Sequence, residues 1–158
     1  MLTLAVEIKK VAPHSIIAIS NSKYNELYAN MKNLNKLLAW GHARAIENIL
    51  EHNNCEYALS DKFGDEKFIQ SALMKNGRNI RLDQMCKAES DIAVAAASVL
   101  ARATFVQKLQ VMEETYGLKF QKGCSNLVKD GARLFIEKYG KERLKEVCKA
   151  HFKTYNEV

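Results

Sequence analysis

The sequence has few of the features that mark linkers, zinc modules or membrane proteins. Its 158 residues include one proline, Pro13, and seven glycines, and its four cysteines form no Cys-x-x-Cys pair. A structural zinc site is therefore not expected, and we expect the cysteines to be reduced, buried thiols. No unbroken apolar run approaches the roughly 18 residues of a membrane helix, so we expect no contact with a membrane.

The N-terminal segment also lacks the order of a signal peptide. In Met1–Lys10 the basic residues follow the apolar ones, the reverse of a signal sequence. We therefore expect a cytoplasmic protein. With 47% hydrophobic and 27% charged residues, the chain has the composition of a globular protein, and we expect residues 1–158 to form a single domain.

Positive charge is concentrated near the C-terminus. Residues 119–158 contain 10 Lys and Arg against 5 Asp and Glu, whereas residues 1–118 contain 14 against 13. A basic surface suits a polyanion, because each phosphate contact releases counterions. A lysine-rich, solvated helical surface has the same composition, so charge alone leaves both interpretations open.

The hydrophobic pattern predicts an α/β fold with a basic helical tail. Helices are expected over residues 2–12, 33–50, 65–75, 90–116, 130–139 and 141–153, and strands over residues 15–20, 55–61 and 79–86. Residues 21–31 are expected to form a loop or a broken helix. Three strands make a thin sheet for so many long helices, which indicates that part of the sheet is missing.

Two acidic residues follow expected strands. Asp61 ends the apolar segment Tyr57–Ser60, at the carboxyl end of the sheet, where open α/β sheets bind ligands. Glu89 precedes the long helix, whose positive N-terminal end favours an ionised carboxylate. Carboxylates in these places suit a hard cation such as Mg²⁺. Both are also ordinary positions for turn and capping residues, so the two roles stay open at this point.

Basic side chains supply candidates for contacts with phosphates. Lys36 and Arg44 lie in one row of an expected helix, Arg102 lies off the alanine-rich face of the long helix, and Lys122 stands beside a glycine in a loop. A solvated surface position explains Arg102 equally well, and the row of Lys36 and Arg44 could instead be an interface between its helix and the core. His42 has no second His or Cys at metal-ligand spacing, so we expect it to be structural or hydrogen-bonded.

Four motifs resemble the bacterial ribonuclease HIII family. They are KYNELY at Lys23–Tyr28, NLNKLLAWGHAR at Asn33–Arg44, LSDKF at Leu59–Phe63 and KAESDIAVAAASVLAR at Lys87–Arg102, and they occur in the family's order. The resemblance covers essentially the whole chain. It implies a ribonuclease H-like mixed sheet flanked by helices, and an endonuclease that hydrolyses the RNA strand of RNA–DNA hybrids.

The resemblance also implies an active site of four acidic residues that bind two Mg²⁺ or Mn²⁺ ions. Asp61 matches the third acid and Glu89 the fourth. The family's first two acids lie in a signature, Asp-Glu-Ser-Gly-Lys-Gly, that this sequence lacks. We therefore expect an N-terminally truncated catalytic domain without its first strands, inactive alone. The alternatives are a non-catalytic hybrid-binding remnant, or a subunit completed by a separate N-terminal segment.

Overall fold

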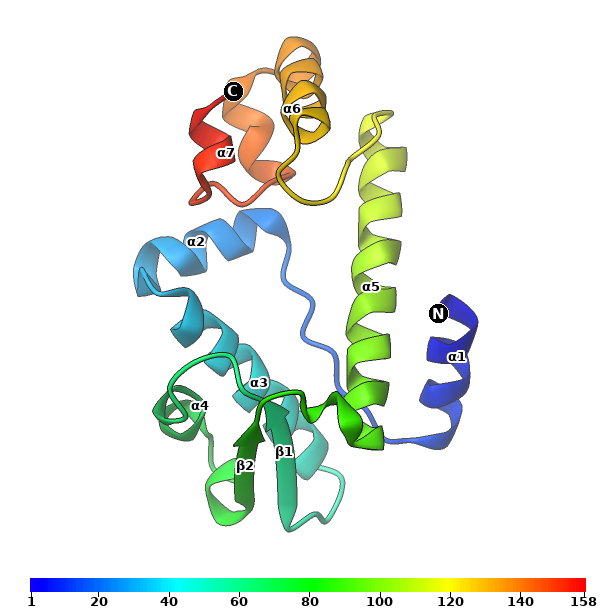
Figure 1. The fold of residues 1–158 in the computed structure, drawn as a ribbon, viewed down its shortest axis with the longest axis vertical. Coiled ribbons are helices and arrows are strands. Elements are labelled where there is room, and N and C mark those ends of the chain that lie inside the picture. The colour runs from blue at the N-terminus through cyan, green and yellow to red at the C-terminus, as the bar shows by residue number, and fades with distance from the viewer. The chain divides into compact units, whose positions relative to one another are not determined.

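The computed structural model describes residues 1–158, which are mostly helical and include one small parallel sheet of two strands (Figure 1). The α-helices are α1 (Leu2–Val11), α2 (Asn21–Met31), α3 (Leu34–Leu50), α4 (Lys67–Ala72), α5 (Ile92–Tyr116), α6 (Asn126–Tyr139) and α7 (Lys153–Asn156). The strands are β1 (Tyr57–Asp61) and β2 (Arg81–Met85), and the 3₁₀ turns are η1 (Gly77–Asn79), η2 (Ala88–Ser90) and η3 (Lys141–Glu146).

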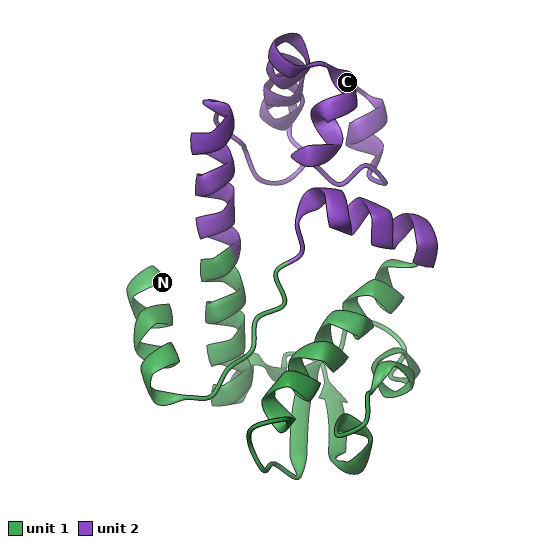
Figure 2. Ribbon diagram, turned by 180° about the vertical axis from the view of Figure 1, so that it is seen from behind, with its two compact units in different colours: residues 1–18, 33–104 green, residues 19–32, 105–158 purple.

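The chain divides into two compact units (Figure 2). The first contains residues 1–18 and 33–104, and the second contains residues 19–32 and 105–158. Both strands belong to the first unit. The prediction that residues 1–158 form a single domain stays a prediction.

In the first unit, β1 and β2 run parallel, with Tyr57 opposite Arg81 and Asp61 opposite Met85. Helix α4 lies in the crossover between them, as a parallel pair requires. The Lys62 N–H extends the pairing beyond β1 by donating to the Met85 carbonyl at 3.0 Å. The two strands therefore end together, and the residues that follow each one emerge at the same edge.

The main core of this unit lies where α3 packs on α4. Ala39 and Ala43 of α3 pack with Ile69 and Leu73, and all four are buried. The small alanine side chains allow the two helices to approach closely. Helix α3 begins after Asn33, whose side chain accepts a hydrogen bond from the Lys36 N–H at 3.1 Å, as an N-cap residue does.

A buried carboxylate fixes the chain segment that leads into β2. Glu47 of α3 is only 5% exposed and accepts hydrogen bonds from the Asn76 N–H at 2.9 Å and the Gly77 N–H at 2.9 Å. These backbone hydrogen bonds, chiefly that of Asn76, lower the pKa of Glu47 below its ordinary value. A carboxyl group that receives backbone N–H donors is stabilised in its charged form. Glu47 therefore ties α3 to the turn that precedes β2.

The second unit has an aromatic core. Phe135 of α6 is fully buried and contacts Tyr116, Phe120 and Tyr139, with ring centroids 5.0–6.2 Å apart. Asn25 of α2 connects that helix to the C-terminal segment. Its amide donates to the carbonyls of residues 145 and 148 at 3.0 and 2.9 Å and accepts from the N–H of residue 150 at 2.9 Å.

Two expectations about the N-terminal third are wrong. Residues 15–20 are extended but form no strand, because no neighbouring strand pairs with them; Ile16 packs instead against the cluster of Ala5, Leu100 and Ala103. Residues 21–31 form one continuous helix, α2, rather than a loop or a broken helix. Ser20 caps it by accepting from the Lys23 N–H at 3.3 Å.

The helix boundaries in the tail and in α4 also differ from the prediction. Helix α6 begins at Asn126 instead of residue 130, and residues 141–153 form η3 and irregular backbone rather than one helix. In that region the Asn25 side chain donates hydrogen bonds to the carbonyls of Lys145 and Cys148, and these bonds compete with helical ones. Helix α4 ends at Ala72, and Arg78 donates to the Leu73 carbonyl at 2.9 Å.

The cysteines are less buried than expected. Cys55, Cys86 and Cys124 are exposed and only Cys148 is partly buried. All four lie outside helices and strands. Burial raises the pKa of the Cys148 thiol to about 11, so this thiol stays protonated at neutral pH.

By length and composition alone, one helix is apolar enough to cross a membrane, and the prediction from unbroken apolar runs stays a prediction. This helix is α5, which has 25 residues. Only 11% of its most apolar 18-residue stretch is buried. Length and composition are the only basis for this finding, and the core helix of a soluble protein meets the same criterion.

We predict that Glu47→Gln lowers the free energy of unfolding of the first unit at neutral pH. On acidification the variant should lose less stability than wild type does. The charged form of Glu47 stabilises the fold above the ordinary Glu pKa of about 4.3, and this contribution is lost as the pH falls through the lowered folded-state pKa. Urea midpoints at pH 7 and pH 3.5 measure both effects. Glu51→Gln, at an exposed position just beyond α3, is the control. Equal pH dependence in Glu47→Gln and wild type would contradict the prediction.

Candidate active site

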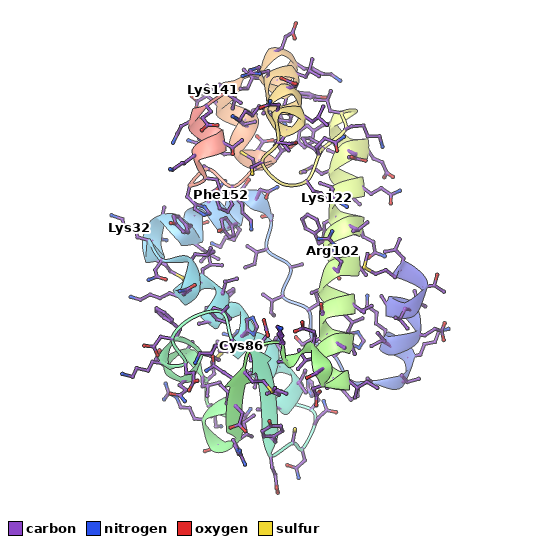
Figure 3. The ribbon with its side chains drawn as sticks, in the orientation of Figure 1. Lys32, Cys86, Arg102, Lys122, Lys141 and Phe152 are labelled. Atoms are coloured by element: carbon purple, nitrogen blue, oxygen red, sulfur yellow. The ribbon has the colours of Figure 1, made fainter.

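The structure brings the Asp61 and Glu89 segments together at the carboxyl edge of the sheet. Asp61 is the last residue of β1, and its Oδ1 accepts a hydrogen bond from the Ala88 N–H at 3.1 Å. Ala88 is fully buried, and Glu89 is the next residue. Cys86, directly after β2, lies at this edge (Figure 3). Two carboxylates far apart in the sequence are thus anchored to one turn.

The turn that carries Glu89 is fixed on both sides. Lys87 has a left-handed backbone, with φ 56° and ψ 41°, which costs a non-glycine residue about 1–2 kcal/mol. After the turn, the Asp91 carboxylate accepts from the Ala93 N–H at 2.8 Å and caps α5. Glu89 itself is exposed and accepts no hydrogen bond. Its carboxylate is therefore accessible to a ligand.

Buried Ser60 and half-buried His42 support the backbone at Asp61. Ser60 is 6% exposed, and its hydroxyl donates to the Asp61 carbonyl at 3.1 Å and lies 3.2 Å from His42 Nδ1. Burial lowers the pKa of His42 below its ordinary value, and the negative charge of Asp61 opposes that shift only in part. His42 is therefore neutral at pH 7. The expectation of a hydrogen-bonded, structural histidine is confirmed.

The donor set suits part of a metal site. Mg²⁺ and Mn²⁺ prefer oxygen ligands in octahedral arrangements, and Asp61 and Glu89 offer carboxylates at one edge. No group of three or more His, Cys, Asp or Glu side chains in the chain is arranged to hold a metal ion. The two carboxylates could supply ligands to an ion, but they do not form a complete site.

The basic candidates are distributed over both units. Lys36 is exposed and Arg44 half-buried on α3, and Arg102 is exposed on α5, all in the first unit. Lys122 belongs to the second unit, where it lines an open hollow of about 400 Å³ together with Glu113 and residues of α5. Arg102 and Lys122 are labelled in Figure 3. Contacts between any of these residues and nucleic acid stay a prediction.

Sequence reasoning missed the backbone part of the site. The Ala88 N–H that holds Asp61, the left-handed Lys87 and the Ser60 hydroxyl carry no motif of their own. The only available signal was their position next to Asp61 and Glu89 in the two motifs.

The chain is mostly helical with a small parallel sheet, and Asp61 and the turn that carries Glu89 lie at the carboxyl end of its strands. The family model for ribonuclease HII matches residues 2–155, and the chain belongs to the ribonuclease HII/HIII family. This confirms the resemblance drawn from the motifs.

The chain is similar to several ribonucleases HIII. It is 40% identical to the ribonuclease HIII of Protochlamydia amoebophila over 155 residues, which is 98% of this chain and 52% of the relative. It is 41% identical to that of Chlamydia trachomatis serovar L2, over 100% of this chain and 53% of the relative. The chain thus spans about half the length of the curated relatives it matches.

A solved structure shares the fold. The crystal structure of Bst-RNase HIII in complex with Mn²⁺ matches with a TM-score of 0.87 and 27% sequence identity, covering 96% of this chain and 51% of that chain. The chain therefore shares the fold of about half of a ribonuclease HIII, but its own sheet has two parallel strands instead of the expected mixed sheet. The expected third strand at residues 15–20 is absent.

We predict that Ser60→Ala destabilises the first unit by about 0.5–1.5 kcal/mol, because the substitution removes the hydrogen-bond partner of half-buried His42. Urea denaturation followed by circular dichroism measures the change. Ser71→Ala is the control, since the Ser71 hydroxyl is exposed and bonds only within its own helix. A loss no larger than that of Ser71→Ala would show that the hydrogen bond contributes little.

Proposed function

We propose that this chain forms part of the catalytic domain of a ribonuclease HIII that hydrolyses the RNA strand of RNA–DNA hybrids. Asp61 and Glu89 would be two of its catalytic carboxylates. The proposal rests chiefly on the hydrogen bond from the Ala88 N–H to Asp61. This bond anchors the two acidic positions to one turn, and they are the two that match the family's acids.

Asp61 and Glu89 would hold Mg²⁺ or Mn²⁺, which activates a water and stabilises the leaving oxygen of a phosphodiester when bound. Mn²⁺ is the ion in the similar Bst-RNase HIII structure. The chain's own contribution is positional. The Ala88 N–H restrains Asp61 Oδ1, and neutral His42 adds no positive charge that would compete with a cation. The first effect orients the carboxylate, and the second leaves it without a competing cation from the protein.

The substrate class follows from family membership and charge. Lysines and arginines outnumber acids two to one in residues 119–158, and such a surface favours a polyanion. Choice of the RNA strand requires contacts to 2′-hydroxyl groups, which DNA lacks. The surface lysines can supply affinity but not that choice. We therefore assign the selection of the RNA strand to residues in the rest of the enzyme or near the acidic edge, which is the carboxyl edge of the sheet with Asp61 and Glu89.

We predict that the purified chain does not cleave an RNA–DNA hybrid in Mg²⁺ or Mn²⁺. Two carboxylates leave most of the coordination of a hard cation to water, and the chain has no third acidic ligand arranged beside them. Incubation with a labelled hybrid and gel electrophoresis test this prediction. Cleavage that is lost in Asp61→Asn would show that the chain is a complete nuclease.

We predict activity in a chimera in which this chain replaces the matched segment of the Protochlamydia amoebophila ribonuclease HIII. In that chimera Asp61→Asn should lower turnover about 100-fold or more, since even outer-shell changes at metal sites cost 10–100-fold, while hybrid binding stays within about twofold. Asp83→Asn is the matched control, because Asp83 lies on β2 and pairs only with exposed Arg81. A parallel loss of binding and turnover would assign Asp61 a structural role.

A further inference from the structure

A row of aromatic rings in the second unit ends in an exposed phenylalanine. Tyr24 and Tyr28 of α2 are stacked with centroids 6.2 Å apart. The His151 ring lies 4.0 Å from Tyr28, with 20° between their planes, and Phe152 lies 4.1 Å from His151. Phe152 is 49% exposed. It stands at the start of α7 (Figure 3).

Packing rather than hydrogen bonding holds this row. Tyr24 is 6% exposed, and neither its hydroxyl nor His151 Nδ1, both buried, has a hydrogen-bond partner. The Asn25 side chain clamps the backbone at residue 150, directly before His151. The ring of His151 is thus fixed between Tyr28 and Phe152. An exposed ring backed in this way is pre-organised, so that a ligand stacking on it orders few further groups.

Cations flank the row. Lys149 Nζ lies 4.5 Å from the centroid of the Tyr24 ring, and Lys153 directly follows Phe152. Neither lysine forms an ion pair with a carboxylate, whereas nearby Lys129 is paired with Glu157 at 2.7 Å. Lys149 therefore lies at the Tyr24 end of the row and Lys153 next to Phe152 in the chain, and no carboxylate of the chain neutralises either charge. The two charges complement a polyanion, and an apolar protein segment would have to bury them unpaired.

We propose that Phe152 is a stacking platform for an unpaired nucleobase of a nucleic-acid strand whose phosphates contact Lys149 and Lys153. Aromatic rings beside lysines are the combination that binds single strands, because every base has a π-face and every nucleotide a phosphate. The inference rests on the proposed function in taking nucleic acid as the partner. It adds a second contact, outside the acidic edge, for single-stranded sequence next to a hybrid.

The test uses the full 158-residue chain and a fluorescein-labelled single-stranded RNA of about 12 nucleotides. Fluorescence anisotropy should show Phe152→Ala and Phe152→Leu each weakening binding about tenfold, within the range found for loss of one stacked base. Phe152→Trp should bind as tightly as wild type. Leu127→Ala, at a 66% exposed apolar position of α6, is the matched control and should change nothing.

Two further measurements report on the contact itself. RNA that carries 2-aminopurine should lose fluorescence on binding to wild type and to Phe152→Trp, but less on binding to Phe152→Leu. Lys149→Gln and Lys153→Gln should each reduce the slope of log Kd against log salt by about 0.7, the value for one phosphate contact on a single strand.

The proposal is overturned if the chain does not bind the RNA, if Phe152→Leu binds like wild type, or if Leu127→Ala weakens binding equally. Retained binding in Phe152→Leu would show that stacking on the Phe152 ring contributes nothing to RNA binding. Cleavage of a blunt hybrid by the chimera tests the proposed function separately, since a blunt hybrid has no unpaired base. Cleavage by the chimera, together with no effect of Phe152 substitutions on RNA binding, would overturn this inference alone. No cleavage, together with weaker RNA binding in Phe152→Leu, would overturn the proposed function alone.

Discussion

Glu47 accepts backbone hydrogen bonds from Asn76 and Gly77 in the interior of the first unit, and the placement of β2 depends on it. The crossover from β1 must return the chain parallel to β1, which requires a fixed starting point for β2. Glu47 provides that point from α3, the helix whose alanines pack against α4. The charge of Glu47 is tolerated in the interior because three hydrogen bonds to its two oxygens replace water.

The positions of Asp61 and of the turn with Glu89 at the acidic edge depend on this strand pairing. Once Asp61 stands opposite Met85, the chain leaving β2 needs only the left-handed Lys87 to turn the Ala88 N–H toward Asp61. The backbone strain at Lys87 is thus offset by a hydrogen bond to a charged group, which is stronger than one between neutral groups. Strain of this kind is found at sites where geometry matters more than local stability.

Periodicity was sufficient to predict α1, α3, α5 and both strands to within about two residues, because each has a strong apolar face or a capping residue such as Asn33 or Asp91. It failed for α2 because the asparagines and tyrosines of that helix contact the C-terminal segment, and such distant contacts leave no local pattern. The acids Asp61 and Glu89 were identified by motif. Neither the role of the Ala88 N–H nor the row of rings that ends at Phe152 could be identified from a motif, because backbone geometry and packing produce them.

The proposed function explains two separate deficits of the first unit together. Its sheet has only two strands, with Tyr57 and Met85 each 45% exposed, and α5 is apolar yet mostly unburied. Its carboxylates form less than a metal site. Unpaired strand edges and exposed apolar faces favour association with further polypeptide, and the curated relatives are about twice as long as this chain. Polypeptide that covered the edge of β1 would also pass beside Asp61, so the same segment could complete the sheet and the set of acidic ligands.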